Sequence, residues 1–212
     1  MIKAIIFDID GVLLDSFESN LKFFQELLTA TGHRAPTREE YKKMYHYNLR
    51  QVLDVYCEGA SEEEKTKIWE MRRTGVFKKD LELVKTPDQL EDVIEKLSKK
   101  YLLGIATSRV KEGVYEYPRL AKLEKHFEIA VSYQDTENHK PHPEPLLFAA
   151  QGLKVKPEEC IYIGDAESDV IAAHAAGMKC IIYSRNKIKD ADAQTVDFNE
   201  IPKLISSFTQ VR

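Results

Sequence analysis

Cysteine is scarce in this chain of 212 residues, which contains only Cys57, Cys160 and Cys180. No two of them form a C-x-x-C pair, and an odd, sparse set of cysteines indicates a reducing compartment without a disulfide framework. Long apolar runs are missing as well, since none approaches the ~20 residues of a membrane-spanning helix. Asp8 and Asp10 also interrupt the apolar N-terminal run that a signal peptide would need. We therefore expect a cytoplasmic protein without a membrane partner.

An excess of positive charge is also missing, because 31 Lys and Arg residues are balanced by 35 Asp and Glu residues, for a formal net charge of -4. This balance disfavours nucleic acid as a partner. The chain has neither a G-x-x-x-x-G-K-[ST] loop nor a G-x-G-x-x-G loop, which disfavours the nucleotide-binding folds that use them. With 43% hydrophobic and 31% charged residues, the composition is typical of a soluble globular protein.

Short apolar runs alternate with helical patterns along most of the chain. Strands are expected at 4–7, 101–106, 128–132, 160–164, 179–183 and, with a weaker pattern, 195–198. Helices are expected over 86–100, 145–151 and 169–176. Thr86 would be the N-cap of the first of these helices, and Gln89 would close its capping box. The alternation predicts an α/β fold: a doubly wound, mostly parallel sheet with helices on both faces.

The interval between the first two predicted strands is too long for one β-α-β unit of ~30 residues. Its excess, roughly residues 15–84, has apolar residues at helical spacing and two capping-box patterns, Thr37-Arg38-Glu39-Glu40 and Ser61-Glu62-Glu63-Glu64. We therefore predict two domains: an α/β core of residues 1–14 and 85–212, and an all-helical cap of residues 15–84. A lid over the strand ends is the economical interpretation, and a helical insertion packed away from them is the alternative.

Carboxylates follow two of the predicted strands directly. Asp8 and Asp10 end the first apolar run, and Asp165 ends the run at 160–164, with Asp169 one helical turn further on. Acids at the end of a buried strand are costly unless a charge compensates them, and a divalent cation prefers hard oxygen ligands of this kind. The alternative for each stretch is a polar turn or a helix N-terminus rich in acids.

Side chains that could bind an anion lie in other predicted loops. Thr107 and Ser108 follow the second strand, and Lys140 lies in a loop with three prolines in five positions. Taken alone, these could be a helix start and a solvated lysine. Ligand sites of open α/β sheets lie at the carboxyl ends of strands, however, and carboxylates, hydroxyls and a lysine gathered there predict a site for moving a phosphoryl group.

These stretches, in this order, resemble the motifs of the haloacid dehalogenase (HAD) superfamily. The chain is most similar to the branch of phosphoglycolate-phosphatase-like and β-phosphoglucomutase-like members with a helical cap, and the resemblance covers essentially its whole length. The resemblance implies a HAD-like Rossmannoid core. It also implies that Asp8 is the nucleophile that forms an aspartyl-phosphate, and that Asp10 is the general acid and base, whose backbone carbonyl also binds the metal.

The same resemblance assigns the other site residues. Thr107 would hold the transferring phosphoryl group, and Lys140 would stabilise both the nucleophile and that group. Asp165 would bind Mg²⁺, with Asp169 supporting the site directly or through water. The implied metal set is therefore Asp8, Asp10, Asp165 and Asp169.

Two features around these motifs lead to further expectations. Substrate contacts are expected from Thr107, Ser108 and Lys140, and from Arg50 in the cap, which could pair with a substrate carboxylate or a second phosphate. The alternative for Arg50 is that it packs or faces solvent. Pro118 falls where relatives have a clean helix, so an irregular structure is expected over 111–126.

The predicted function is a Mg²⁺-dependent phosphatase that hydrolyses a small phosphorylated metabolite, of the phosphoglycolate or sugar-phosphate type. One alternative is a phosphomutase similar to β-phosphoglucomutase. Another is a non-catalytic binding or regulatory protein on the same scaffold, against which the complete set of motif residues counts. Either a monomer or a homodimer is expected.

Overall fold

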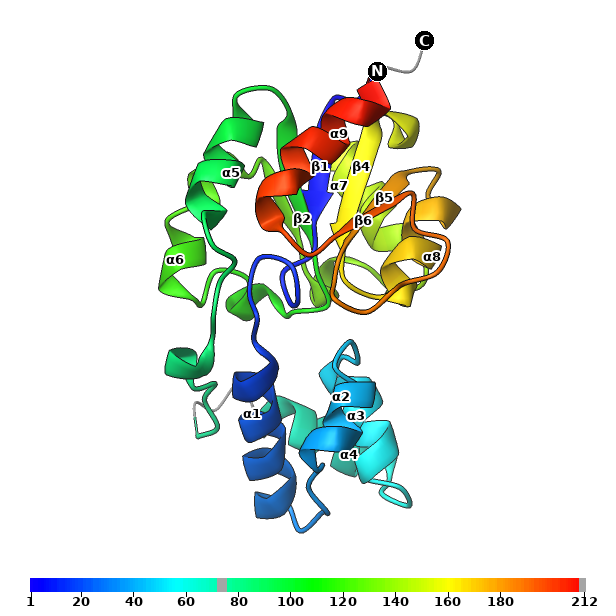
Figure 1. Cartoon of the computed structure of the whole chain (residues 1–212). Coiled ribbons are helices and arrows are strands. Elements are labelled where there is room, and N and C mark those ends of the chain that lie inside the picture. The colour runs from blue at the N-terminus through cyan, green and yellow to red at the C-terminus, as the bar shows by residue number, and fades with distance from the viewer. Residues whose placement is uncertain (72–75, 210–212) are drawn as a thin grey trace. The chain divides into compact units, whose positions relative to one another are not determined.

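A six-stranded parallel sheet forms the centre of the fold (Figure 1). The computed structural model describes residues 1–71 and 76–209. The strands are β1 (Ala4–Phe7), β2 (Leu102–Ala106), β3 (Ile129–Val131), β4 (Cys160–Gly164), β5 (Lys179–Tyr183) and β6 (Ala193–Thr195). Their order is β3-β2-β1-β4-β5-β6, and every neighbouring pair is parallel. The predicted α/β fold is confirmed.

The middle of the sheet is made of the most apolar strands. All residues of β1 and β4 are buried, as is expected where helices cover both faces of a parallel sheet. The register pairs Ala4 of β1 with Leu102 of β2 on one side and with Cys160 of β4 on the other. The strand order reverses between β1 and β4, and such a switch point is where an open α/β sheet leaves a crevice for ligands.

Helices cover both faces of this sheet. They are α5 (Leu90–Ser98), α6 (Pro118–Ala121), α7 (Glu144–Gly152), α8 (Glu167–Ala175) and α9 (Ile201–Thr209). Helices α7 and α8 share one hydrophobic cluster with Ile6 and Tyr162. Side chains alternate along a strand, so Ile5 and Phe7 point to the opposite face, where Figure 1 shows α5 and α9.

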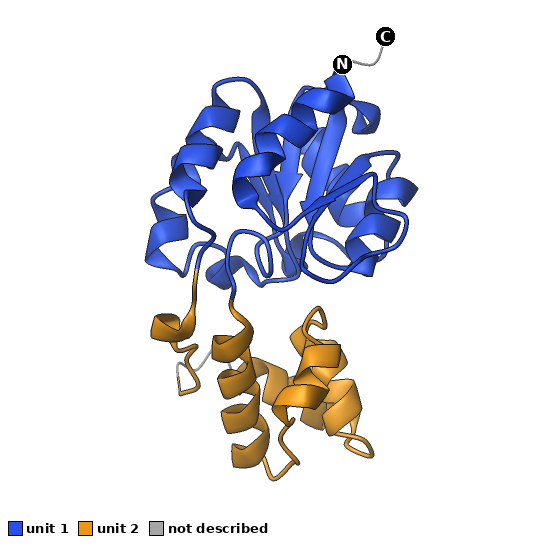
Figure 2. Cartoon of the chain, in the orientation of Figure 1, with its two compact units in different colours: residues 1–15, 86–212 blue, residues 16–85 orange. Residues whose placement is uncertain are grey.

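A second compact unit is formed by residues 16–85, while residues 1–15 and 86–212 form the first (Figure 2). The helices of the second unit are α1 (Phe17–Ala30), α2 (Arg38–Lys43), α3 (Leu49–Tyr56) and α4 (Glu62–Met71). This unit has a hydrophobic core of its own, in which Leu27, Leu28 and Leu53 are fully buried. That it is a cap over the strand ends stays a prediction.

Both predicted capping boxes of the second unit are formed. Thr37 and Glu40 exchange side-chain and backbone hydrogen bonds at the start of α2. Ser61 and Glu64 do the same before α4, with the Ser61 N–H donating to Glu64 Oε2 at 2.7 Å and the Glu64 N–H to Ser61 Oγ at 3.2 Å. Local capping chemistry therefore decides where these helices begin.

The predicted start of the helix at 86–100 is wrong. Helix α5 begins only at Leu90, and its N-cap is Gln89, which has a left-handed φ of 56°. The Thr86 hydroxyl, predicted to cap the helix, instead accepts a hydrogen bond from the guanidinium of Arg119. A tertiary contact that the local pattern cannot show has replaced the cap.

The last strand was predicted a few residues too late. Strand β6 ends at Thr195, and Val196 is exposed. Asp197 then accepts a hydrogen bond from the N–H of Asn199 at 2.9 Å, a side-chain to backbone contact that starts a turn. The irregular region predicted around Pro118 is confirmed, since 111–126 contains two 3₁₀ turns and only the four-residue α6.

Among the described residues, no helix has both the length and the apolar character needed to cross a membrane.

The buried middle of the sheet leads to a prediction of stability. Ile6→Ala leaves a cavity beside α7 and α8, so we expect it to lower the free energy of unfolding by about 2–5 kcal/mol. Leu102→Ala, at a strand residue that is 40% exposed, is the matched control and should cost less than about 1 kcal/mol. Urea unfolding of the three proteins measures both values, and equal losses would contradict this packing.

Candidate active site at the ends of β1, β2 and β4

Asp8 occupies the first position beyond β1. Its backbone N–H donates to the carbonyl of Ile163 at 2.9 Å, which extends the pairing with β4 by one residue. Its Oδ1 accepts from the N–H of Ile9 at 2.8 Å, and its Oδ2 lies 2.9 Å from Lys140 Nζ. Burial, only partly offset by Lys140, raises the pKa of Asp8 to about 6. The sheet therefore presents a fixed, buried carboxyl group at its switch point.

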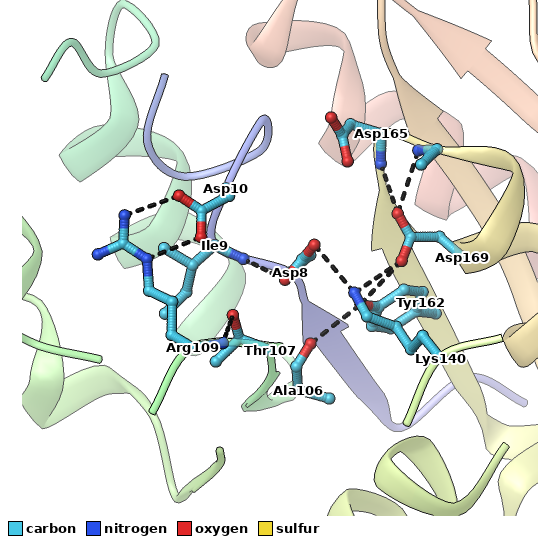
Figure 3. Close-up of polar contacts among 11 residues, drawn as sticks. Asp8, Ile9, Asp10, Ala106, Thr107, Arg109, Lys140, Tyr162, Asp165 and Asp169 are labelled. Atoms are coloured by element: carbon cyan, nitrogen blue, oxygen red, sulfur yellow. Dashed lines mark hydrogen bonds and ion pairs between the residues drawn. The ribbon is translucent and has the colours of Figure 1, made fainter. Parts of the chain in front are cut away.

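Lys140 supplies the positive charge of the site (Figure 3). Its Nζ lies 2.7 Å from Asp169 Oδ1 and donates to the hydroxyl of Tyr162 at 2.8 Å, in addition to its contact with Asp8. Burial alone would lower the pKa of Lys140, but the charges of Asp169 and Asp8 outweigh it and hold the pKa well above the usual value. Lys140 is therefore a permanent cation at neutral pH.

Three carboxyl groups come together beside this lysine. Asp8, Asp165 and Asp169 each offer an oxygen, and these oxygens lie within 4.8 Å of one another. Burial, followed by the charges of the neighbouring acids, raises the pKa of Asp165 well above its ordinary value. A cluster of oxygen donors with more acids than bases is suited to a hard divalent cation such as Mg²⁺.

Two glycines make room for this cluster. Gly11 has a φ of +80°, and a Cβ at that position would lie 2.0 Å from Asp165 Oδ2. A Cβ at Gly164 would lie 2.4 Å from the Cβ of Asp169. Any side chain at either position would displace a carboxyl group of the cluster, so the glycines allow the acids to approach one another.

Asp169 is held more firmly than the other two acids. Its Oδ2 accepts from the backbone N–H groups of Asp165 at 3.0 Å and Ala166 at 3.1 Å, at the start of α8. Its Oδ1 accepts from Lys140 Nζ at 2.7 Å. Asp169 therefore orders the end of β4 and orients the lysine, while it also lies within reach of a cation.

Asp10 points away from the carboxyl cluster and pairs with Arg109 (Figure 3). The guanidinium donates from Nε to Asp10 Oδ2 at 2.8 Å and from one terminal nitrogen to Asp10 Oδ1 at 2.7 Å. The Asp10 carboxyl group is not among the three clustered acids. Its predicted part in metal binding concerns its backbone carbonyl and stays a prediction.

Thr107 and Ser108 lie directly after β2. Thr107 is buried, its N–H donates to the carbonyl of Val131 at 3.0 Å, and its Oγ1 accepts from the N–H of Arg109 at 3.2 Å. Ser108 is half-buried. Figure 3 shows Thr107 between Arg109 and the part of the site that contains Asp8.

Arg50 belongs to the second unit, and it forms an ion pair with Glu62 there. Its guanidinium also lies 3.5 Å from the hydroxyl of Thr66. The predicted contact of Arg50 with substrate stays a prediction.

Two residues of the site were not predicted from the sequence. Tyr162 lies inside β4, and its hydroxyl donates to the carbonyl of Ala106 at 3.0 Å while it accepts from Lys140. Arg109 follows the predicted residues Thr107 and Ser108, and its guanidinium pairs with Asp10. A phenol hydroxyl in a strand and a buried arginine are both polar groups that need a partner. That requirement is the feature of the sequence that could have marked Tyr162 and Arg109 as candidate site residues.

Comparison with known proteins identifies the family. The model of the haloacid dehalogenase-like hydrolases matches residues 5–183, and this chain belongs to that family, as predicted. Over 184 residues, 86% of this chain and 83% of the relative, it is 31% identical to the pyrophosphatase PpaX of Bacillus thuringiensis (strain Al Hakam).

Solved structures agree with the family. A HAD-superfamily hydrolase of subfamily IA, variant 1, from Geobacter sulfurreducens PCA is 28% identical with a TM-score of 0.73, covering 96% of this chain and 100% of that one. The β-phosphoglucomutase of Clostridium difficile shares the fold with a TM-score of 0.80 at 22% identity, covering 99% of each chain. The chain is therefore a hydrolase of this family.

The clustered acids lead to a prediction about divalent cations and pH. Because the pKa of Asp8 is raised from 3.8 to about 6 in the fold, the folded protein holds a proton between these values that the unfolded chain lacks. The stability that this proton supplies is lost as the pH rises through about 6. Mg²⁺ should restore stability above that pH, by about 2.7 kcal/mol when its concentration is a hundredfold above its Kd.

Thermal unfolding with Mg²⁺ and with EDTA, between pH 5 and pH 8, measures this effect. We expect the gain from Mg²⁺ to shrink toward pH 5, where protons compete for Asp8 and Asp165. Asp165→Asn should abolish the gain, while Asp88→Asn, at an exposed acid of the same unit, should leave it unchanged. A gain that is independent of pH, or that survives in Asp165→Asn, would contradict the site.

Proposed function

We propose that this protein is a Mg²⁺-dependent phosphatase that acts on a small phosphorylated metabolite through a phosphorylated Asp8. The observation that carries the proposal is the ion pair of Asp8 with the buried ammonium of Lys140, beside the clustered acids at the switch point of the sheet. The similarity to pyrophosphatase PpaX supports hydrolysis of a phosphoryl group and makes pyrophosphate a candidate substrate beside phosphoglycolate and sugar phosphates.

In the first step, an oxygen of the Asp8 carboxylate attacks phosphorus, and the bond from phosphorus to the leaving oxygen breaks. The carboxylate is well suited to this role, because Ile9 N–H and Lys140 Nζ hold its two oxygens in fixed directions. Fixing the nucleophile removes much of the entropic part of the barrier. The product is an acyl phosphate on Asp8 and the released alcohol or phosphate.

The charge on the phosphoryl group needs stabilisation during this transfer. Lys140 brings a permanent positive charge next to the nucleophile, and it is already held in place by Asp169 and Tyr162. The hydroxyl of Thr107 can donate a hydrogen bond to a phosphoryl oxygen. Asp8, Asp165 and Asp169 would hold a Mg²⁺ ion, which would neutralise negative charge on these acids and on the phosphoryl group.

In the second step, water attacks phosphorus and restores Asp8, with release of inorganic phosphate. Asp10 is proposed to give a proton to the leaving oxygen in the first step and to take one from the water in the second. A carboxyl group separate from the metal cluster suits this role, because it can exchange protons while the clustered acids hold the cation. The pair of Asp10 with Arg109 fixes the orientation of this carboxyl group.

Phosphate release is the test of this proposal. The purified protein is assayed with Mg²⁺ against sugar phosphates, phosphoglycolate, nucleotides and pyrophosphate, beside Asp8→Asn, an EDTA sample and the control Asp88→Asn. We expect release that depends on Mg²⁺, that falls by about a thousandfold or more in Asp8→Asn, and that is unchanged in the control.

The other outcomes of the assay have distinct meanings. Release that survives in Asp8→Asn would contradict Asp8 as the nucleophile. An isomeric sugar phosphate in place of inorganic phosphate would favour the phosphomutase. A ligand-dependent rise in the melting temperature without turnover would favour a binding protein.

A further inference from the structure

Arg109, in the segment that follows β2, forms a forked ion pair with Asp10. Two nitrogens of the guanidinium donate to the two oxygens of the carboxylate, at 2.8 and 2.7 Å. The side chain of Arg109 is only 6% exposed, and that of Asp10 is 24% exposed. Two parallel charge-assisted bonds shielded from water fix the orientation of both groups far better than an exposed pair does.

The arginine is itself held at two further points. Its remaining terminal nitrogen donates to the carbonyl of Gly113 at 3.0 Å, and its backbone N–H donates to Thr107 Oγ1 at 3.2 Å. The segment from Thr107 to Gly113 therefore connects the Asp10 carboxyl group and the Thr107 hydroxyl through one anchored residue. This connection reaches from the end of β2 to the turn after β1.

The turn that carries Asp10 needs such an anchor. Asp10 is followed by Gly11 in a left-handed conformation, so the backbone beyond it leaves the sheet at once. A half-buried carboxyl group on this turn could adopt several rotamers, each at a different distance from a substrate. A misplacement of about 1 Å is enough to reduce catalysis by two orders of magnitude.

We propose that Arg109 is a positioning residue, which holds the Asp10 carboxyl group in the orientation from which it serves the leaving oxygen and the attacking water. This inference rests on the proposed function, and it assigns Arg109 no contact with the substrate. Lysine could not replace it fully, because a single ammonium lacks the planar fork that fixes both carboxylate oxygens.

This role can be tested with two substrates, one whose leaving group needs a proton and one whose leaving group does not. The alkoxide of phosphoglycolate must be protonated as it leaves, whereas the nitrophenolate of p-nitrophenyl phosphate departs without a proton. We expect Arg109→Gln to lower kcat/KM for phosphoglycolate by about a hundredfold, and kcat/KM for p-nitrophenyl phosphate by less than about threefold. Arg109→Lys should lie between Arg109→Gln and the wild type with phosphoglycolate.

Arg119 offers a matched control. It forms the same forked pair with Glu91, at 2.8 and 2.7 Å, but both partners are more than 40% exposed. Arg119→Gln should leave both kcat/KM values unchanged, and thermal unfolding of each variant shows that it is folded. Asp10→Ala is the reference, which should show the same contrast between the two substrates as Arg109→Gln.

The outcomes distinguish a failure of this inference from a failure of the proposed function on which it rests. Equal losses for both substrates in Arg109→Gln, or no loss, would overturn the positioning role if Asp10→Ala still shows the contrast. Equal losses in Asp10→Ala would instead contradict the proposed acid and base, and the role of Arg109 with it. A wild-type protein that releases phosphate from neither of these substrates, nor from any other member of the substrate panel, would contradict the proposed function itself.

Discussion

The contact of one buried ammonium group with two buried carboxylates is the interaction on which the site depends. Lys140 lies between Asp8 and Asp169, and a third acid, Asp165, lies within the same cluster. Three acids with one base leave an excess of negative charge away from water, which is costly unless a proton or a cation reduces it. The raised pKa values of Asp8 and Asp165 express that cost. In the proposed function, the same excess of negative charge gives the site its affinity for a hard cation together with a phosphoryl group.

The order of the strands explains how residues from distant parts of the sequence reach this cluster. Strand β1 pairs with β2 on one side and β4 on the other, so the carboxyl ends of all three open onto the same edge of the sheet. The end of β4 brings Asp165 and, through the first turn of α8, Asp169 to the side of Asp8 where Lys140 lies. The end of β2 brings Thr107 and Arg109 to the other side, where Arg109 pairs with Asp10. The site thus has one half that contains the clustered acids and Lys140, and another half that we propose transfers protons.

The parallel sheet and the clustered acids could be predicted because both depend on local patterns. Apolar runs of β-branched residues define β1 and β4, and acids directly after such runs need compensation. The contact of Asp10 with Arg109 could not be predicted, because the strand ends bring both residues to the same edge of the sheet without determining which side chains pair there. Tyr162 looked like one more apolar residue of β4, although its hydroxyl holds Lys140. The capping pattern at Thr86 failed for the same reason, since a distant arginine occupies its hydroxyl. The roles of the site residues and of the helical unit stay predictions.

Detection of the covalent intermediate is the most direct test of the central claim, which is that Asp8 is phosphorylated. The protein is quenched with acid during turnover of its best substrate and reduced with borohydride, which converts an acyl phosphate to an alcohol and leaves a free carboxylate unchanged. Peptide mass spectrometry then locates the reduced side chain. The account predicts reduction at position 8 in a fraction of the molecules, only when substrate is present. Reduction at another acid, or none during steady turnover at the times sampled, would contradict it.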